Sequence, residues 1–225
     1  MNATSSLLLI EEGPEYQAAG LVHRYLMPDR PGPYPTIVLL HGRYGNEEVM
    51  WIFRRTAPQP WLMVAPRANL SESAGRYSWL HQPADYWPDL EEFDPAVETL
   101  NKFTQALPQL YNADPDRMYL MGFSQGAAVA ISLALRDPHL VRGIASLVGF
   151  APKMESTAIE GVLNGLPVFM AVGTEDMRVP IEESQRSAEL LRRAGTSLTY
   201  KTYPTGHKVS GEGMKDLKNW WITQT

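Results

Sequence analysis

Ser124, Asp176 and His207 are the side chains of this sequence whose types and order suit nucleophilic catalysis. A serine hydroxyl is a weak nucleophile unless a base removes its proton, and a histidine serves as that base when a carboxylate orients its ring. The chain order serine, aspartate, histidine is the one expected when the three follow successive strands of an α/β sheet. Together these residues predict acyl transfer through a covalent intermediate.

The serine lies in the segment Gly122-Phe123-Ser124-Gln125-Gly126, between an apolar strand at 116–121 and a small-residue helix at 127–135. This pattern is typical of a nucleophile elbow, a strained turn that lifts the hydroxyl clear of the sheet. Glycine suits both flanking positions because the turn crowds the strand against the helix. The helix that follows directs its N-terminal amides toward any oxyanion formed there. The alternative is a glycine-rich turn with an incidental serine.

The aspartate and the histidine each follow a predicted strand. Asp176 comes after the apolar run 168–172, and His207 comes after 198–203. Reactive groups of open α/β sheets gather outside the carboxyl ends of the strands, so both residues occupy suitable loops. Asp176 alone is also compatible with a turn or helix-cap role, and its neighbour Glu175 is a competing acid.

The other histidines fit the role of the base less well than His207 does. One lies in an early strand, one in an aromatic loop and one in a proline-bounded turn. The fourth lies beside a glycine-rich turn, where we expect a role toward the backbone. These residues are His23, His81, His139 and His41.

The glycine-rich segment 41–47, His-Gly-Arg-Tyr-Gly-Asn-Glu, directly follows the first buried strand. Acyl transfer develops negative charge on the carbonyl oxygen, so prepositioned amides are needed to face it. The backbone N–H groups of Arg43 and Gln125 are the expected donors of this oxyanion hole. The alternative is a turn that only leads into a helix capped at Asn46.

Apolar strands alternate with helices along the whole chain, which predicts an α/β fold with a mostly parallel, doubly wound sheet and helices on both faces. We expect residues 1–225 to form a single domain, with antiparallel N-terminal strands at a sheet edge and the proline-rich stretch 28–35 as a loop. Strands are expected at 5–10, 20–27, 36–40, 62–65, 118–121, 143–148, 168–172 and 198–203. Helices are expected at 47–56, 88–107, 125–136, 181–194 and 209–222, the second of them interrupted near Asp94-Pro95.

Composition restricts the class of protein further. The 225 residues include 44% hydrophobic and 20% charged residues, which are ordinary globular values. A formal net charge of -5 gives no general attraction for nucleic acid, and no apolar run reaches membrane-spanning length. Cysteine is absent, which excludes disulfides, thiolate metal sites and a cysteine nucleophile. The only apolar run near the N-terminus, 7–10, is too short for a signal-peptide core, so we expect a cytoplasmic protein.

Taken together, L-H-G-x-x-G-x-E, G-F-S-Q-G, G-x-x-D-x-x-V-P and G-H resemble the phospholipase/carboxylesterase family of α/β-hydrolases, which includes bacterial carboxylesterases and acyl-protein thioesterases. The resemblance spans residues 39 to 207 and implies the α/β-hydrolase fold. It also implies hydrolysis of small-molecule carboxylic esters or thioesters, without metal or organic cofactor. It assigns Ser124, Asp176 and His207 as the triad, with the amides of Arg43 and Gln125 as oxyanion donors.

Substrate specificity is less well defined by the sequence. Arg43-Tyr44 stands where the eukaryotic thioesterases have a smaller apolar residue and a glycine, so these side chains are expected to narrow or polarise the pocket mouth. We expect substrate contacts from Tyr44, Trp79 and Met177, and small to medium acyl groups. For the aromatic stretch that contains Trp79, packing beneath a loop is the alternative. A serine peptidase, a lactone hydrolase and a non-catalytic pseudo-hydrolase are the competing functions, and a homodimer is among the assemblies left open.

Overall fold

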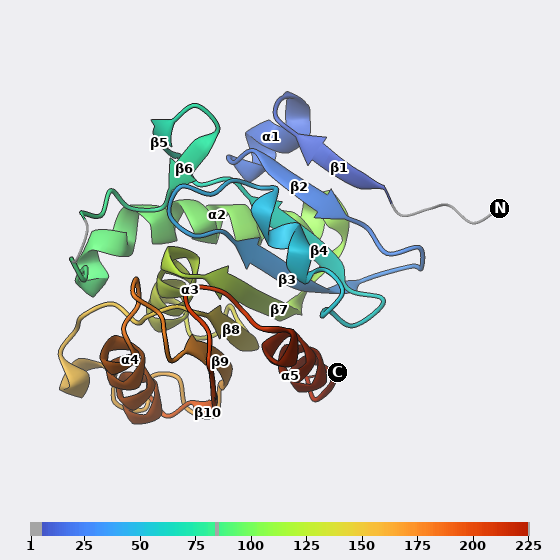
Figure 1. Ribbon diagram of the computed structural model, residues 1–225. Coiled ribbons are helices and arrows are strands. Elements are labelled where there is room, and N and C mark those ends of the chain that lie inside the picture. Colours follow the sequence, from blue (N-terminus) through green and yellow to red (C-terminus); the bar gives the residue numbers. More distant parts are fainter. Residues whose placement is uncertain (1–5, 84–85, 225) are drawn as a thin grey trace.

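The computed structural model describes residues 6–83 and 86–224. Within this part of the chain, eight strands form one sheet in the order β1-β2-β4-β3-β7-β8-β9-β10 (Figure 1). Strands β4, β3, β7, β8, β9 and β10 are parallel, while β1 and β2 pair antiparallel at one edge, as predicted. The strands are β1 Leu7–Ile10, β2 His23–Leu26, β3 Tyr34–Leu40, β4 Leu62–Pro66, β7 Ala113–Phe123, β8 Gly143–Leu147, β9 Pro167–Gly173 and β10 Ser197–Tyr203.

Helices cover both faces of this sheet (Figure 1). Val38 and Leu40 of β3 belong to a core cluster shared with α1, α2, α3 and α4. Ile37 and Leu39 point to the opposite face, where a second cluster includes Trp221 of α5. A strand buried on both sides needs apolar residues at every position, which explains its unbroken hydrophobic run. The helices are α1 Gly13–Ala19, α2 Asp94–Tyr111, α3 Gln125–Arg136, α4 Ile181–Arg193 and α5 Gly211–Ile222.

Several local elements differ from those expected. The predicted helix at 47–56 is only the 3₁₀ helix η1, Val49–Phe53. The indole N–H of Trp51 donates to the carbonyl of Glu47 at 2.8 Å, and the backbone N–H of Trp51 bonds one residue later, to Glu48. In an α-helix the backbone N–H of Trp51 would donate to the Glu47 carbonyl, but the indole already occupies that acceptor. The segment therefore remains a 3₁₀ helix.

The helix expected over 88–107 is divided at Asp94, where η2 Leu90–Phe93 gives way to α2. Pro95 lies in the first turn of α2, where its missing N–H removes no intrahelical bond. The short helix α1, the hairpin of β5 Leu70–Ser73 with β6 Arg76–Ser78, and the 3₁₀ turn η3 Ser156–Ile159 were not predicted. They are too short to show a clear period in the sequence.

The parallel strands determine where the loops of interest meet. β3, β7, β9 and β10 run in the same direction, so the segments that follow them leave the same edge of the sheet. Those segments contain residues 41–47, Ser124, Asp176 and His207. The topology therefore brings all four predicted motifs to one edge.

Candidate active site

Ser124 occupies a strained turn between β7 and α3. Its backbone has φ 53° and ψ −118°, a region that side chains with a Cβ rarely adopt. A Cβ at Gly122 would lie 2.3 Å from the carbonyl oxygen of Gly126, and one at Gly126 would lie 2.2 Å from that of Leu40. No side chain fits at either contact, so both glycines are required by the turn. The surrounding structure holds the serine in this conformation at the wall of a cavity.

His207 and Asp176 form a buried hydrogen-bonded pair. The Nδ1 atom of His207 lies 2.7 Å from Oδ2 of Asp176, and their side chains are 12% and 1% exposed. The other carboxylate oxygen, Oδ1, accepts the backbone N–H groups of Arg178 at 2.8 Å and Val179 at 3.0 Å. A carboxylate only accepts hydrogen bonds, so Nδ1 carries the proton and Nε2 is left with its lone pair. The ring of Phe123 packs edge-on against the imidazole, with centroids 5.2 Å apart.

The serine and the histidine line the same cavity, whose volume is about 510 Å³. Among the described residues, no hydrogen bond joins the Ser124 hydroxyl to His207. In unliganded hydrolases this contact is often long and tightens only when substrate binds. The structure therefore brings the three predicted residues to one site, with the aspartate and histidine already paired.

Arg43 and Gln125, the two predicted oxyanion donors, both line this cavity. Gln125 is the first residue of α3, so its N–H has no acceptor within the helix. The N–H of Arg43 has no hydrogen-bond acceptor in the part of the chain that the structure describes, whereas that of Tyr44 donates to Ser78 Oγ at 3.3 Å. Two unpaired amides at the wall that contains the serine suit the binding of an oxyanion.

His41 anchors the loop that contains Arg43. Its Nδ1 atom donates to the carbonyl of Gly42 at 2.7 Å, and its Nε2 atom accepts the backbone N–H of Ala68 at 3.0 Å. Burial lowers the pKa of His41 to about 4, so the ring is neutral at physiological pH. The role toward the backbone that was expected for this histidine is the one its contacts show.

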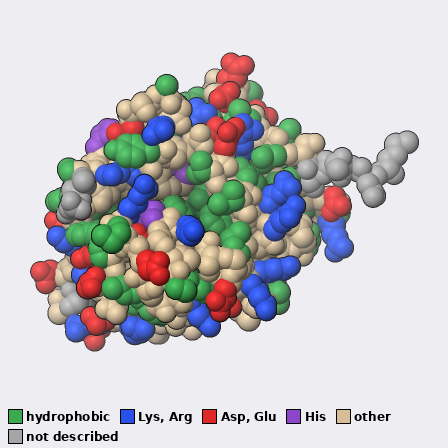
Figure 2. All heavy atoms as spheres, viewed as in Figure 1, with side chains coloured by type: hydrophobic (Ala, Val, Ile, Leu, Met, Phe, Trp, Pro, Cys, Tyr) green, Lys and Arg blue, Asp and Glu red, His purple; other side chains and the backbone are tan. Residues whose placement is uncertain are grey.

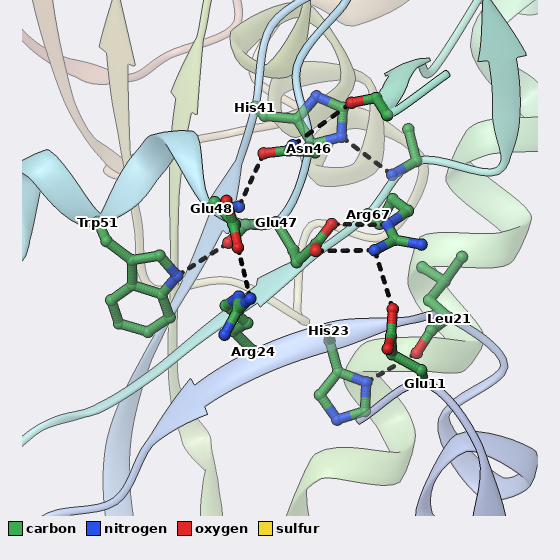
Figure 3. Close-up of polar contacts among 12 residues, drawn as sticks. Glu11, Leu21, His23, Arg24, His41, Asn46, Glu47, Glu48, Trp51 and Arg67 are labelled. Carbon is green, nitrogen blue, oxygen red and sulfur yellow. Dashed lines mark hydrogen bonds and ion pairs between the residues drawn. The ribbon is translucent and has the colours of Figure 1, made fainter. Parts of the chain in front are cut away.

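Glu47 and Arg67 form a second support beneath the same loop (Figure 3). Arg67 donates from Nε and Nη2 to the two carboxylate oxygens of Glu47, at 2.6 and 2.8 Å, and also contacts Glu11. Burial by itself would raise the pKa of Glu47, but the hydrogen bonds and charge of Arg67 outweigh it and hold the pKa below its usual value. The sequence placed Glu47 in a motif without giving it a role, because its partner lies 20 residues away on another strand end.

The predicted substrate contacts divide into two groups. Tyr44 and Met177 are 47% and 91% exposed and line the cavity. Trp79 is 3% exposed and does not line it, because the ring packs beneath the loop, the alternative considered for this stretch. Its indole N–H donates to the carbonyl of His41 at 2.8 Å, and its backbone N–H donates to the side-chain oxygen of Gln125 at 2.9 Å.

The cavity is lined by further residues besides Tyr44 and Met177. Aromatic residues form part of the wall, and Arg178 lines the cavity as well. The aromatic residues are Tyr86, Trp87, Phe123 and Phe150. Within residues 6–83 and 86–224, no three His, Asp or Glu side chains are grouped as metal ligands would be, and no helix is long and apolar enough to cross a membrane.

A mostly parallel sheet with a strained serine elbow, followed in sequence by aspartate and histidine loops, defines the α/β-hydrolase fold. The chain belongs to the Phospholipase/Carboxylesterase family, whose sequence profile matches residues 27–224. The crystal structure of the Bacillus cereus carboxylesterase superposes with a TM-score of 0.83, covering 93% of this chain and 97% of that one at 23% sequence identity. The predicted fold and family are thus confirmed.

Curated relatives match over shorter segments. A probable carboxylesterase SOBER1-like protein of Arabidopsis thaliana is 30% identical over 110 residues, which cover 48% of this chain and 42% of the relative. Acyl-protein thioesterase 1 of Debaryomyces hansenii is 29% identical over 137 residues, 58% of each chain. The matched part therefore spans about half the length of these relatives.

Proposed function

We propose that this protein is a serine hydrolase that cleaves carboxylic esters or thioesters of small to medium acyl groups. The observation that carries the proposal is the 2.7 Å contact between His207 and Asp176 at the wall of the cavity that Ser124 also lines. A paired imidazole, a serine on an elbow and two free amides are the parts that acyl transfer needs. The names of the relatives, carboxylesterase and acyl-protein thioesterase, agree with this chemistry.

In the proposed cycle, Nε2 of His207 accepts the hydroxyl proton as Ser124 Oγ attacks the carbonyl carbon. Asp176 stabilises the imidazolium, and the amides of Arg43 and Gln125 bind the oxyanion. When the tetrahedral intermediate collapses, His207 gives its proton to the departing alcohol or thiol. Water then attacks the acyl-enzyme with the same proton transfers, which releases the acid and restores the serine.

We also propose a location and a substrate size for this protein. A cytoplasmic location agrees with the absence of cysteine. We propose small-molecule esters as substrates, because the cavity volume of about 510 Å³ is in the range of small-molecule sites. A homodimer is among the assemblies left open, and analytical ultracentrifugation distinguishes it from a monomer.

Covalent labelling separates a working hydrolase from a non-catalytic member of the fold. A fluorophosphonate probe should label the wild-type protein and leave Ser124→Ala unlabelled, while the exposed Ser73→Ala variant is labelled normally. Loss of the nucleophile should lower kcat on a p-nitrophenyl ester by roughly a million-fold. Labelling or turnover of Ser124→Ala at the wild-type rate would reject the assignment.

A substrate panel decides between the related reactions. Wild-type protein is tested on p-nitrophenyl esters of increasing chain length, acyl-thioesters, lactones and aminoacyl amides. Ester or thioester turnover should exceed that of the amides, because an amine leaving group is harder to expel. Turnover restricted to amides would instead support a peptidase, and turnover restricted to lactones would support a lactone hydrolase.

A further inference from the structure

Two arginines line the candidate active-site cavity. Arg43 comes from the loop after β3, and Arg178 comes from the loop that contains Asp176. Among the described residues, no aspartate or glutamate lines the cavity. The permanently charged side chains at this wall therefore all have the same sign.

In the part of the chain that the structure describes, neither guanidinium group pairs with a carboxylate. Arg43 donates to the backbone carbonyl of Gln82, and its guanidinium carbon lies 4.8 Å from the centre of the Tyr44 ring, so both partners are uncharged. The side chain of Arg178 makes no hydrogen bond or ion pair within residues 6–83 and 86–224. Arg67, Arg136 and Arg186, in contrast, each pair with an acid.

The carboxylates of Asp176 and Glu92 have hydrogen-bond partners other than these two arginines. The carboxylate of Asp176 is 1% exposed, and its oxygens are occupied by His207 and by backbone N–H groups. Glu92 accepts hydrogen bonds from the hydroxyl of Tyr86 at 2.6 Å and from the backbone of Asp89 at 2.8 Å. Figure 2 shows a group of Lys and Arg side chains beside a histidine on the left of the face drawn, although the chain as a whole has a net charge of -5.

The loop that contains Arg43 holds its neighbour Tyr44 in an unfavourable backbone conformation. Its φ of 63° lies in the left-handed region, which is unfavourable for a residue with a large side chain. The same backbone conformation leaves the tyrosine ring at the cavity wall and beside the Arg43 guanidinium. Strain of this kind is concentrated at ligand-binding and catalytic segments.

We infer that the cavity selects esters that carry a second, anionic group, a carboxylate or a phosphate, which Arg43 and Arg178 bind. Trp87 and Phe150, whose rings meet edge-on at 4.9 Å, supply an apolar wall for the carbon skeleton between the anionic group and the ester. The inference rests on the proposed hydrolase function and names its substrate class. Oppositely charged groups raise both the rate of encounter and the selectivity for the charged ligand.

Matched substrates test this inference. The acyl arm compares p-nitrophenyl hexanoate with the mono-p-nitrophenyl ester of adipic acid and with its phosphonate-ended analogue. The leaving-group arm compares p-nitrophenyl acetate with the acetate of a carboxy-substituted nitrophenol. In at least one arm, kcat/KM of the wild-type protein should be about tenfold higher for the anionic ester at low salt, and the preference should fall in 1 M NaCl. The carboxylate and the phosphonate then show which anion is preferred.

Charge variants identify the residues responsible. Arg178→Gln and Arg43→Gln should each lower the ratio of anionic to neutral kcat/KM, and Arg178→Glu should bring it to unity or below. The matched control is Arg54→Gln, an exposed arginine that lines a different surface hollow and should leave the ratio unchanged. Equal wild-type rates on charged and neutral esters would overturn the inference while leaving the hydrolase proposal intact. If no ester is cleaved and the fluorophosphonate does not label Ser124, the proposed function itself fails.

Discussion

Arg67 donates two hydrogen bonds to the carboxylate of Glu47, from Nε at 2.6 Å and from Nη2 at 2.8 Å, beneath the loop that contains Arg43. Glu47 is 3% exposed, so replacing it leaves a largely buried guanidinium without its main partner. Glu47→Gln should lower the free energy of unfolding by about 2 kcal/mol, and the melting temperature by roughly 4–8 °C. The exposed pair of Glu48 with Arg24 supplies the control, because Glu48→Gln should change stability by only about 0.5 kcal/mol.

The ion pair of Glu47 with Arg67 also predicts that stability depends on pH. The pKa of Glu47 is held below its ordinary value of 4.5, so the carboxylate stabilises the fold fully above that pH. The stabilisation is lost as the pH falls below 4.5 and through the lower pKa of the folded state. The difference in melting temperature between wild type and Glu47→Gln should therefore be largest near neutrality and shrink toward pH 3. A difference that stayed constant would show that the charge of Glu47 is not what stabilises the loop.

His41 predicts a second acid transition at higher pH. Burial lowers its pKa from 6.5 to about 4, so protonation favours the unfolded chain. The contribution of neutral His41 to the free energy of unfolding is fully present above pH 6.5. It decreases by about 3 kcal/mol as the pH falls from 6.5 toward 4. Urea unfolding of His41→Gln should give a lower stability at pH 7 and a flatter profile between these values. The exposed His139→Gln should keep the wild-type slope, and an equally steep slope in His41→Gln would contradict the assignment.

The glycine after the elbow gives a test of packing. A methyl group at Gly126 would lie 2.2 Å from the carbonyl oxygen of Leu40, a contact that neither backbone can relieve locally. Gly126→Ala should cost about 3 kcal/mol of stability or more, and displace the Gln125 amide from the cavity. At Gly211, in the first turn of α5, a methyl group meets no atom within 4 Å, so Gly211→Ala should stay within about 0.5 kcal/mol of wild type. Equal stability of the two variants would refute the steric explanation.

The sequence was most informative where a local pattern and the chain direction determine the result together. The apolar runs identify the buried strands, and parallel strands bring Ser124, Asp176 and His207 to one edge although they are far apart in the chain. The elbow could be recognised because its glycines are adjacent to the serine. Strand-to-helix boundaries were also accurate at α3, where periodicity and the glycine turn coincide.

Contacts between side chains that are distant in the chain could not be predicted from local sequence patterns. Periodicity predicted an α-helix at 47–56, but the contact of the Trp51 indole with the Glu47 carbonyl belongs to the folded chain. The partner of Glu47 and the unpaired state of Arg178 are likewise set by tertiary structure, because an arginine in a sequence carries no sign of which acids reach it. Trp79 was expected at the substrate, whereas the bond from its indole to His41 makes it a support for the loop.

Asp176 and Glu175 are adjacent acids that the sequence could not separate, and their contacts predict opposite outcomes on substitution. Oδ2 of Asp176 accepts from His207, and Oδ1 accepts two backbone N–H groups, whereas Glu175 is exposed and does not line the cavity. In Asp176→Asn the amide oxygen can still accept the two backbone N–H groups, but the NH₂ group then faces Nδ1 of His207. Because NH₂ donates, Nδ1 must accept, which places the histidine proton on Nε2 and removes the base. By analogy with the same change in other triads, kcat on a p-nitrophenyl ester should fall by roughly 10⁴ with the fold retained. Glu175→Gln should keep kcat within about twofold of wild type, and a comparable loss in both variants would mean that Asp176 does not orient the histidine.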